Sequence, residues 1–208
     1  MGCVQSQSNG QPAAKDKGGA AGGVINDNNG QGGASAVIVD PRLPLNARQK
    51  YSMLASWKGI SRALEPTGVY MFIKLFEEHQ ELLNLFTKFH KLTTRDEQAS
   101  SEELAEHAVS VMTTLDESIR SLDNVDAFIL YLHQVGQSHY KIPGFQKEYF
   151  WKIRNPFLEA VKMTLGDRYT DNIENIYKVS INLVIETLVE GYEKAHQQHL
   201  AGAGGPSS

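Results

Sequence analysis

The 208-residue chain has little of what several large protein classes require. Its single cysteine, Cys3, excludes an internal disulfide and a cysteine-based zinc site. No apolar run approaches the roughly 20 residues that a membrane-spanning helix needs. The 20 lysines and arginines are outnumbered by 24 aspartates and glutamates, giving a net charge of −4. The sequence therefore offers no basic field of the kind that binds nucleic acid.

Common catalytic motifs are missing as well. The sequence contains no Gly-x-Ser-x-Gly, no phosphate-binding glycine loop and no HExxH, so it gives no support to the enzymes that depend on them. Glycine is scarce in the middle of the chain: nine of the 18 glycines fall in residues 1–35, and only six lie between residues 36 and 200. That middle part has the length of one domain with a well-formed core.

The first residues carry a lipidation signal. Met1-Gly2-Cys3-Val4-Gln5-Ser6 fits the myristoylation pattern, in which Gly2 is exposed once the methionine is removed. One myristoyl chain binds membranes only marginally, with an association constant of about 10⁴ M⁻¹, so Cys3 is the expected palmitoyl site. No apolar signal-peptide segment is present. The alternative is a chance match to a short pattern. Dual acylation predicts attachment to the cytoplasmic face of a membrane, the plasma membrane above all.

Composition divides the chain into three parts. Residues 7–36 are rich in Gly, Ser, Asn, Gln and Ala and lack aromatic residues, so they bury too little apolar surface to offset the entropy of ordering. We predict a flexible tether over 1–44, a folded domain over 45–197 and a disordered tail over 198–208. About 30 flexible residues reach on the order of 30 Å, by roughly 5–6 Å × √n.

Helical periodicity runs through the folded part, and no stretch alternates convincingly with period two. Ser100-x-x-Glu103 and Asp171-x-x-Glu174 resemble capping boxes, and Gly166 suits a helix end. The sequence therefore predicts an all-α fold with about six main helices. The apolar stripes comprise Val69, Phe72, Ile73 and Phe76; Leu104, His107, Ala108, Val111 and Leu115; Phe128, Leu132, Val135 and His139; and Ile173, Ile176, Leu183, Val184 and Leu188.

Pro156 conflicts with this pattern, because it falls inside the otherwise helical stretch 145–165. A proline in a helix interior removes one hydrogen bond and costs about 3 kcal/mol unless the helix bends. We therefore expect a kink at this position.

Two of the seven histidines, His107 and His139, lie on apolar faces of predicted helices. Two imidazoles that enter one apolar pocket from two helices are suited to hold a haem iron. Simpler interpretations remain open for each residue. His139 could be a helix-end histidine that interacts with the helix dipole, and His107 could be a partly buried structural histidine.

The order of several motifs resembles the globin family, and within it the neuroglobin and globin X branches. Phe86 stands 21 residues before His107, and His139 follows His107 by 32 residues. The resemblance covers about residues 45–197. The segments that carry it are Ser56-Trp57-Lys58, residues 68–76, Glu81-Leu82-Leu83-Asn84-Leu85-Phe86, Glu103-Leu104-Ala105-Glu106-His107 with Val111, Val135-Gly136-Gln137-Ser138-His139, and Gly191-Tyr192.

The resemblance implies a globin fold around haem b, with His139 as the proximal iron ligand. It favours His107 as a second, distal ligand in a six-coordinate resting state, although His107 could instead donate a hydrogen bond to bound O₂. Phe72, Phe86, Val111 and Val135 would wall the pocket. Without the histidines, those four residues would be taken as ordinary core.

Three functions follow from these observations. The first is a membrane-anchored globin that binds O₂, CO and NO reversibly, in oxygen or redox sensing or in protection. The second is a haem redox enzyme that reduces nitrite to NO or transfers electrons from an unidentified reductase. The third is a haem-free acylated adaptor that binds proteins, for which a colourless protein would be evidence.

Overall fold

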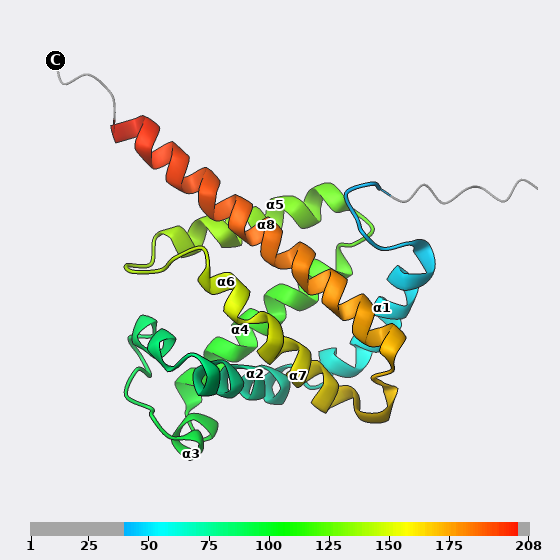
Figure 1. Cartoon of the computed structure of the whole chain (residues 1–208), viewed down its shortest axis with the longest axis horizontal. Helices are drawn as coiled ribbons and strands as arrows, with labels where there is room; N and C mark the ends of the chain where they lie inside the picture. Colours follow the sequence, from blue (N-terminus) through cyan, green and yellow to red (C-terminus); the bar gives the residue numbers. More distant parts are fainter. Residues whose placement is uncertain (1–39, 204–208) are drawn as a thin grey trace, which may run out of the picture. The chain divides into compact units, whose positions relative to one another are not determined.

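The computed structural model describes residues 40–203, and Gly2 and Cys3 lie outside this range. Within it every regular element is a helix (Figure 1). No helix among these residues is long and apolar enough to cross a membrane. The elements are α1 (Ala47–Ser61), α2 (Leu64–Glu78), η1 (Gln80–Leu85), α3 (Arg95–Ala99), α4 (Glu102–Arg120), α5 (Val125–Tyr140), α6 (Tyr149–Lys152), α7 (Arg154–Leu165), η2 (Gly166–Arg168) and α8 (Asp171–Ala203).

The folded part extends beyond the predicted boundaries 45–197 at both ends. Leu43 is buried in the core, and the Arg42 guanidinium lies 2.8 Å from a carboxylate oxygen of Asp126. At the other end, α8 continues to Ala203. Residues 40–44 therefore pack against the domain, and residues 198–203 are helical, because apolar contacts and helix propagation act past the points where the composition changes.

Neither predicted capping box forms, and the residue that caps each helix lies one position away from the predicted one. Ser101 caps α4, because its hydroxyl accepts a hydrogen bond from the Leu104 amide at 3.2 Å, whereas Ser100 ends α3. At α8 the hydroxyl of Thr170 accepts from the Ile173 amide at 3.4 Å. In both cases a neighbouring hydroxyl residue takes the capping position that the motif assigned to Ser100 or Asp171.

The helix interruption expected at Pro156 lies three residues earlier, at Ile153. The chain forms two helices here, α6 and α7, and Pro156 is the third residue of α7. The missing N–H of a proline costs little in a first turn, because the first amides of a helix have no partner within it. The first regular bond of α7 follows directly, from the Phe157 amide to the Ile153 carbonyl at 2.9 Å.

Two helix pairs form the frame of the domain: α2 packs on α4, and α5 packs on α8. In Figure 1 α8 crosses α5 and then continues toward the C-terminus. The crossing has almost no space between the two backbones, since a Cβ atom at Gly136 would lie 2.1 Å from the Leu188 carbonyl oxygen. A Cβ at Gly191 would lie 2.4 Å from the His133 carbonyl oxygen. These two glycines therefore fix how closely α5 approaches α8.

Candidate functional site

A cavity of about 1120 Å³ lies between these helix pairs. It is larger than the roughly 300–1,000 Å³ of a typical ligand pocket. His107 reaches it from α4 and His139 from the last turn of α5. The four residues expected to wall the pocket all line it: Phe72, Phe86, Val111 and Val135.

His139 has a fixed orientation. Its Nδ1 lies 2.8 Å from the carbonyl oxygen of Val135, one turn earlier in α5. Because a carbonyl only accepts, Nδ1 must carry the proton, which leaves the lone pair of Nε2 free for a metal. The rings of Phe145 and Phe150 pack against the imidazole at 5.0 and 4.9 Å between centroids. Burial lowers the pKa of His139, which keeps the ring neutral.

His107 is held differently. Its ring has no hydrogen bond to any of residues 40–203. It is surrounded instead by Phe72, Phe86 and Phe89, at centroid distances of 5.0, 5.1 and 5.9 Å. Burial lowers the pKa of His107 to about 4, with smaller contributions from His139 and Lys88. A neutral imidazole, the form that binds iron, is therefore present at neutral pH.

His107 and His139 could complete the coordination of a metal that already has most of its ligands from a cofactor. Within residues 40–203 no three His, Cys, Asp or Glu side chains are grouped to hold an ion alone. A porphyrin supplies four nitrogens and leaves two axial positions, the number that His107 and His139 provide. Lys88 and Lys141 also line the cavity, where their ammonium groups offer partners for the carboxylates of such a cofactor. The residues present therefore fit haem.

Sequence reasoning missed three aromatic residues that contact the histidines: Phe89, Phe145 and Phe150. Phe89 follows Phe86 by three positions. Both lie in the irregular segment after η1, where a spacing of three does not show that two side chains share a face. Phe145 and Phe150 come after the turn at Pro143-Gly144, so their approach to His139 depends on how the chain folds back. None of the three lies on the apolar stripe that carries its histidine.

The remaining histidines face away from the cavity. His133, on the same helix as His139, points toward α8, where its Nε2 lies 3.1 Å from a carboxylate oxygen of Glu190. His79 lies 3.6 Å from a carboxylate of Glu81, and His196 stacks on Tyr140. The structure thus separates one facing pair from the other described histidines.

Comparisons with known proteins agree with this geometry. Residues 69–188, more than half of the chain, match the globin family. The chain is similar to neuroglobin from Dissostichus mawsoni, with 27% identity over 72% of this chain and 94% of that protein. Danio rerio neuroglobin is 25% identical over the same shares.

A solved structure is similar too. It is that of a hexacoordinated heme protein from an anhydrobiotic tardigrade, 42% identical, with a TM-score of 0.72. The match covers 74% of this chain and 99% of that one. The predicted all-α globin fold and the likeness to neuroglobin are confirmed, and the chain belongs to the globin family.

Proposed function

We propose that this globin holds haem b between His139 and His107 and binds O₂, CO and NO at the iron. The observation that carries the proposal is the pair of neutral imidazoles that enter one apolar cavity from α5 and α4. When bound, haem supplies a ferrous iron with reversible affinity for diatomic gases. The likeness to a hexacoordinated heme protein supports a resting state in which both histidines bind the iron.

The residues around the cavity have different roles in this proposal. His139 is the permanent ligand, because its bond to the Val135 carbonyl aims Nε2 into the cavity. His107 is the exchangeable ligand and must move aside before a gas binds. Phe72 and Phe86 exclude water from the distal side. The apparent gas affinity is then the intrinsic affinity multiplied by the fraction of protein in which His107 is displaced.

Absorption spectra of the haem-loaded protein test this proposal. We expect split, sharp visible bands in the deoxy-ferrous form, which indicate two axial imidazoles. His107→Ala should keep the haem and give one broad band, whereas His139→Ala should lose most of the haem. His133→Ala is the matched control, because that residue lies on α5 and points away from the cavity. Full haem retention by His139→Ala would contradict the proposal.

A haem-free adaptor would have no use for this cavity or for two neutral histidines within it. A colourless protein that takes up no haem would nevertheless favour the adaptor. The reductase that would return ferric iron to the ferrous state remains to be identified by its activity toward the purified protein.

We also propose that acyl chains on Gly2 and Cys3 attach the globin to the cytoplasmic face of the plasma membrane. The support is the sequence Met1-Gly2-Cys3-Val4-Gln5-Ser6. A fixed location suits local sensing or protection better than oxygen transport. Metabolic labelling with myristate and palmitate analogues tests this. Gly2→Ala should abolish both labels and release the protein from membranes, and Cys3→Ser should abolish only palmitate. Membrane retention by Gly2→Ala would refute the anchor.

A further inference from the structure

The first helix of the domain carries positive charge on its outer side. Residues 41–64 contain five basic residues and no acidic one, although the whole chain has a net charge of −4. On α1, Met53, Trp57 and Ile60 are buried in the core. The opposite side is exposed and forms what we call the basic face, made of Arg48, Tyr51, Ala55, Lys58 and Arg62. Spacings of three and four positions place these residues on one line, about 21 Å long at roughly 1.5 Å per residue.

The cations of the basic face are not neutralised by neighbouring carboxylates. Within residues 40–203, Arg48, Lys58 and Arg62 take part in no ion pair. Lys50, on the side of the same helix, differs from them, because its ammonium group lies 2.6 Å from a carboxylate oxygen of Asp123. The outermost cations of α1 are therefore the ones left available to an external anion.

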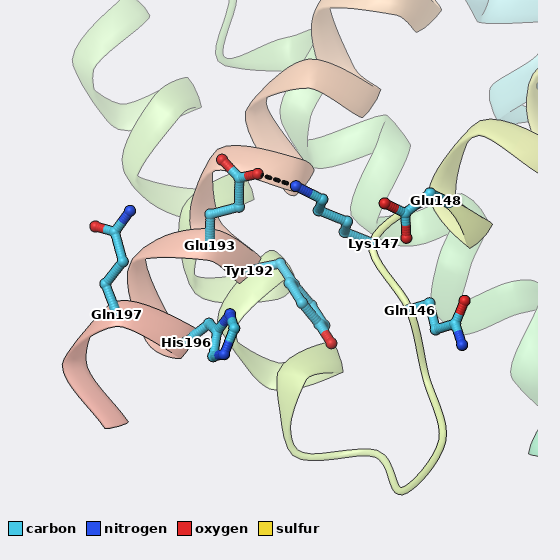
Figure 2. A pocket seen from close by; sticks show the side chains of 7 residues that line it. All are labelled: Gln146, Lys147, Glu148, Tyr192, Glu193, His196 and Gln197. Carbon is cyan, nitrogen blue, oxygen red and sulfur yellow. Dashed lines mark hydrogen bonds and ion pairs between the residues drawn. The ribbon is translucent and has the colours of Figure 1, made fainter. Parts of the chain in front are cut away.

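Other cations of the described surface are paired. Figure 2 shows one example at the open pocket beside Tyr192, where Lys147 forms an ion pair with Glu193. Arg95 likewise lies 2.8 Å from a carboxylate oxygen of Glu77. At these two places the charges cancel, whereas on the basic face they add.

A further cation approaches the basic face from η2. A Cβ atom at Gly59 would lie 3.2 Å from a guanidinium nitrogen of Arg168, so this guanidinium lies directly against α1, next to Lys58. Arg168 is exposed and takes part in no ion pair within residues 40–203. The positive charge therefore comes from two elements that are far apart in the sequence.

Helix stability alone does not explain the position of Arg48. The N-terminus of a helix has a partial positive charge, which favours acidic residues in the first turn. The helices α2, α4, α5 and α8 each have an acidic residue there. The first turn of α1 has none, and Arg48 is its second residue. The helix dipole accounts for Lys58 in the last turn but opposes Arg48, which favours a role for this cation outside the helix.

An anionic lipid surface suits the basic face better than a protein partner does. The cytoplasmic leaflet of a membrane is negatively charged and attracts Lys and Arg side chains. Tyr51 stands on the same line and is 74% exposed, and tyrosine suits the headgroup region because its ring is apolar and its hydroxyl polar. A stable protein interface needs about 800 Å² of closely packed surface on each partner. The basic face is a single line of side chains, and α1 lines neither the haem cavity nor the pocket beside Tyr192.

We propose that the basic face of α1 binds anionic lipid headgroups and holds the globin domain against the membrane. The proposal deepens the proposed acyl anchor and rests on it for the location in the cell. The acylation motif precedes α1 in the sequence, so an anchored chain keeps the basic face at a high effective concentration near lipid, where weak contacts suffice. Because α1 contributes no residue to the haem cavity, the lipid and the gas would meet different elements of the protein.

The test measures how the full-length haem protein, made without acyl chains, binds to vesicles in a sedimentation assay. Vesicles of phosphatidylcholine alone are compared with vesicles that also contain phosphatidylserine, at low and at high salt. The variant Arg48→Gln/Lys58→Gln/Arg62→Gln removes three charges of the basic face. Denaturant unfolding first checks that the variant is as stable as the wild-type protein.

The wild-type protein should bind only the vesicles that contain phosphatidylserine, and high salt should release it because the attraction is screened. A cation near an anionic surface contributes about fivefold to the affinity, so the triple variant should bind roughly 100-fold more weakly. The matched control is Lys91→Gln/Lys152→Gln/Lys194→Gln, which removes the same charge from elements other than α1. The control should bind within about twofold of the wild type, because distant charges are screened.

Two outcomes would overturn the proposal. Equal losses in the two triple variants would mean that only the total charge matters. Absence of wild-type binding to phosphatidylserine vesicles would exclude lipid and point to an acidic protein as the partner of the basic face. The acyl anchor fails separately: Gly2→Ala that stays on cell membranes after a high-salt wash refutes the anchor, whereas the vesicle assay involves no acyl chain and tests α1 alone.

Discussion

His139 and His107 face the same cavity, but one ring is fixed by a hydrogen bond and the other by aromatic contacts alone. His139 donates to the Val135 carbonyl, on a helix whose backbone touches that of α8 at Gly136 and Gly191. His107 has only the edges and faces of three phenylalanine rings around it. Because the backbones of α5 and α8 touch, the helix that carries His139 has no room to move. The phenylalanine rings around His107, by contrast, can shift by rotation.

This difference explains why two identical side chains would do different work. A net hydrogen bond contributes about 0.5–1.5 kcal/mol and also sets the tautomer. An aromatic pair contributes a similar 0.5–1.5 kcal/mol beyond burial, but it sets no tautomer. In the proposed haem site, His139 would therefore stay in place, whereas His107 could leave the iron. Three substitutions, taken from the largest expected effect to the smallest, test that contrast.

The largest effect is expected from Gly191→Ala. The new Cβ would lie 2.4 Å from the carbonyl oxygen and 2.6 Å from the Cα of His133, and backbone atoms cannot rotate aside. We expect the free energy of unfolding to fall by about 1–3 kcal/mol or more, with α5 and α8 pushed apart. Denaturant unfolding measures the loss, and transfer of haem to an acceptor protein should become faster.

Gly202→Ala is the matched control, since it lies on the same helix and a Cβ there meets nothing within 4 Å. It should leave stability unchanged or raise it slightly. Equal stabilities for the two alanine variants would show that the α5–α8 contact does not make the proximal side rigid.

An intermediate effect is expected from Phe89→Leu on the distal side. It removes a ring stacked 4.9 Å from Phe86 and 5.9 Å from His107. With each ring pair contributing about 0.5–1.5 kcal/mol, His107 should dissociate from the iron up to about tenfold faster. Stopped-flow CO binding measures this step.

Phe128→Leu serves for comparison, because Phe128 is a 1% exposed core residue that does not line the cavity. Phe128→Leu should lower the free energy of unfolding about as much as Phe89→Leu does. It should leave the rate at which His107 dissociates from the iron unchanged. If Phe89→Leu and Phe128→Leu changed that rate equally, the phenylalanine rings around His107 would have no specific role in holding it.

The smallest effect is expected from Lys147→Gln, which breaks the ion pair with Glu193 at the proximal rim. Both side chains are 42% exposed, and exposed pairs contribute about 0–1 kcal/mol. The free energy of unfolding should fall by less than about 1 kcal/mol, and the rates of CO binding should match those of the wild-type protein. A marked change in CO binding would mean that the surface loop, in addition to the α5–α8 contact, controls the proximal side.

Local pattern was enough to locate the helices and to single out the two histidines. The stripes through Leu104 and Phe128 lie on α4 and α5 as expected, because helical periodicity depends only on neighbours a few positions apart. The caps at Ser101 and Thr170 were each missed by one residue. Pro156 signalled an interruption of the helix, but its place in the first turn of α7 was missed, because a proline alone does not show where the next helix begins.

The sequence by itself determined the helical class, the two candidate axial histidines and the candidate acylation sites. Each of these depends on residue type and short spacing. Tertiary structure decided that Phe89 packs on His107, that Phe145 and Phe150 pack on His139, and that a pocket opens beside Tyr192. The contact of Phe89 with His107 depends on how the segment after η1 packs on α4, and those of Phe145 and Phe150 depend on how the chain folds back after α5. The pocket depends on how that returning loop meets α8. These arrangements exist only once the helices have packed, so short-range spacing cannot determine them.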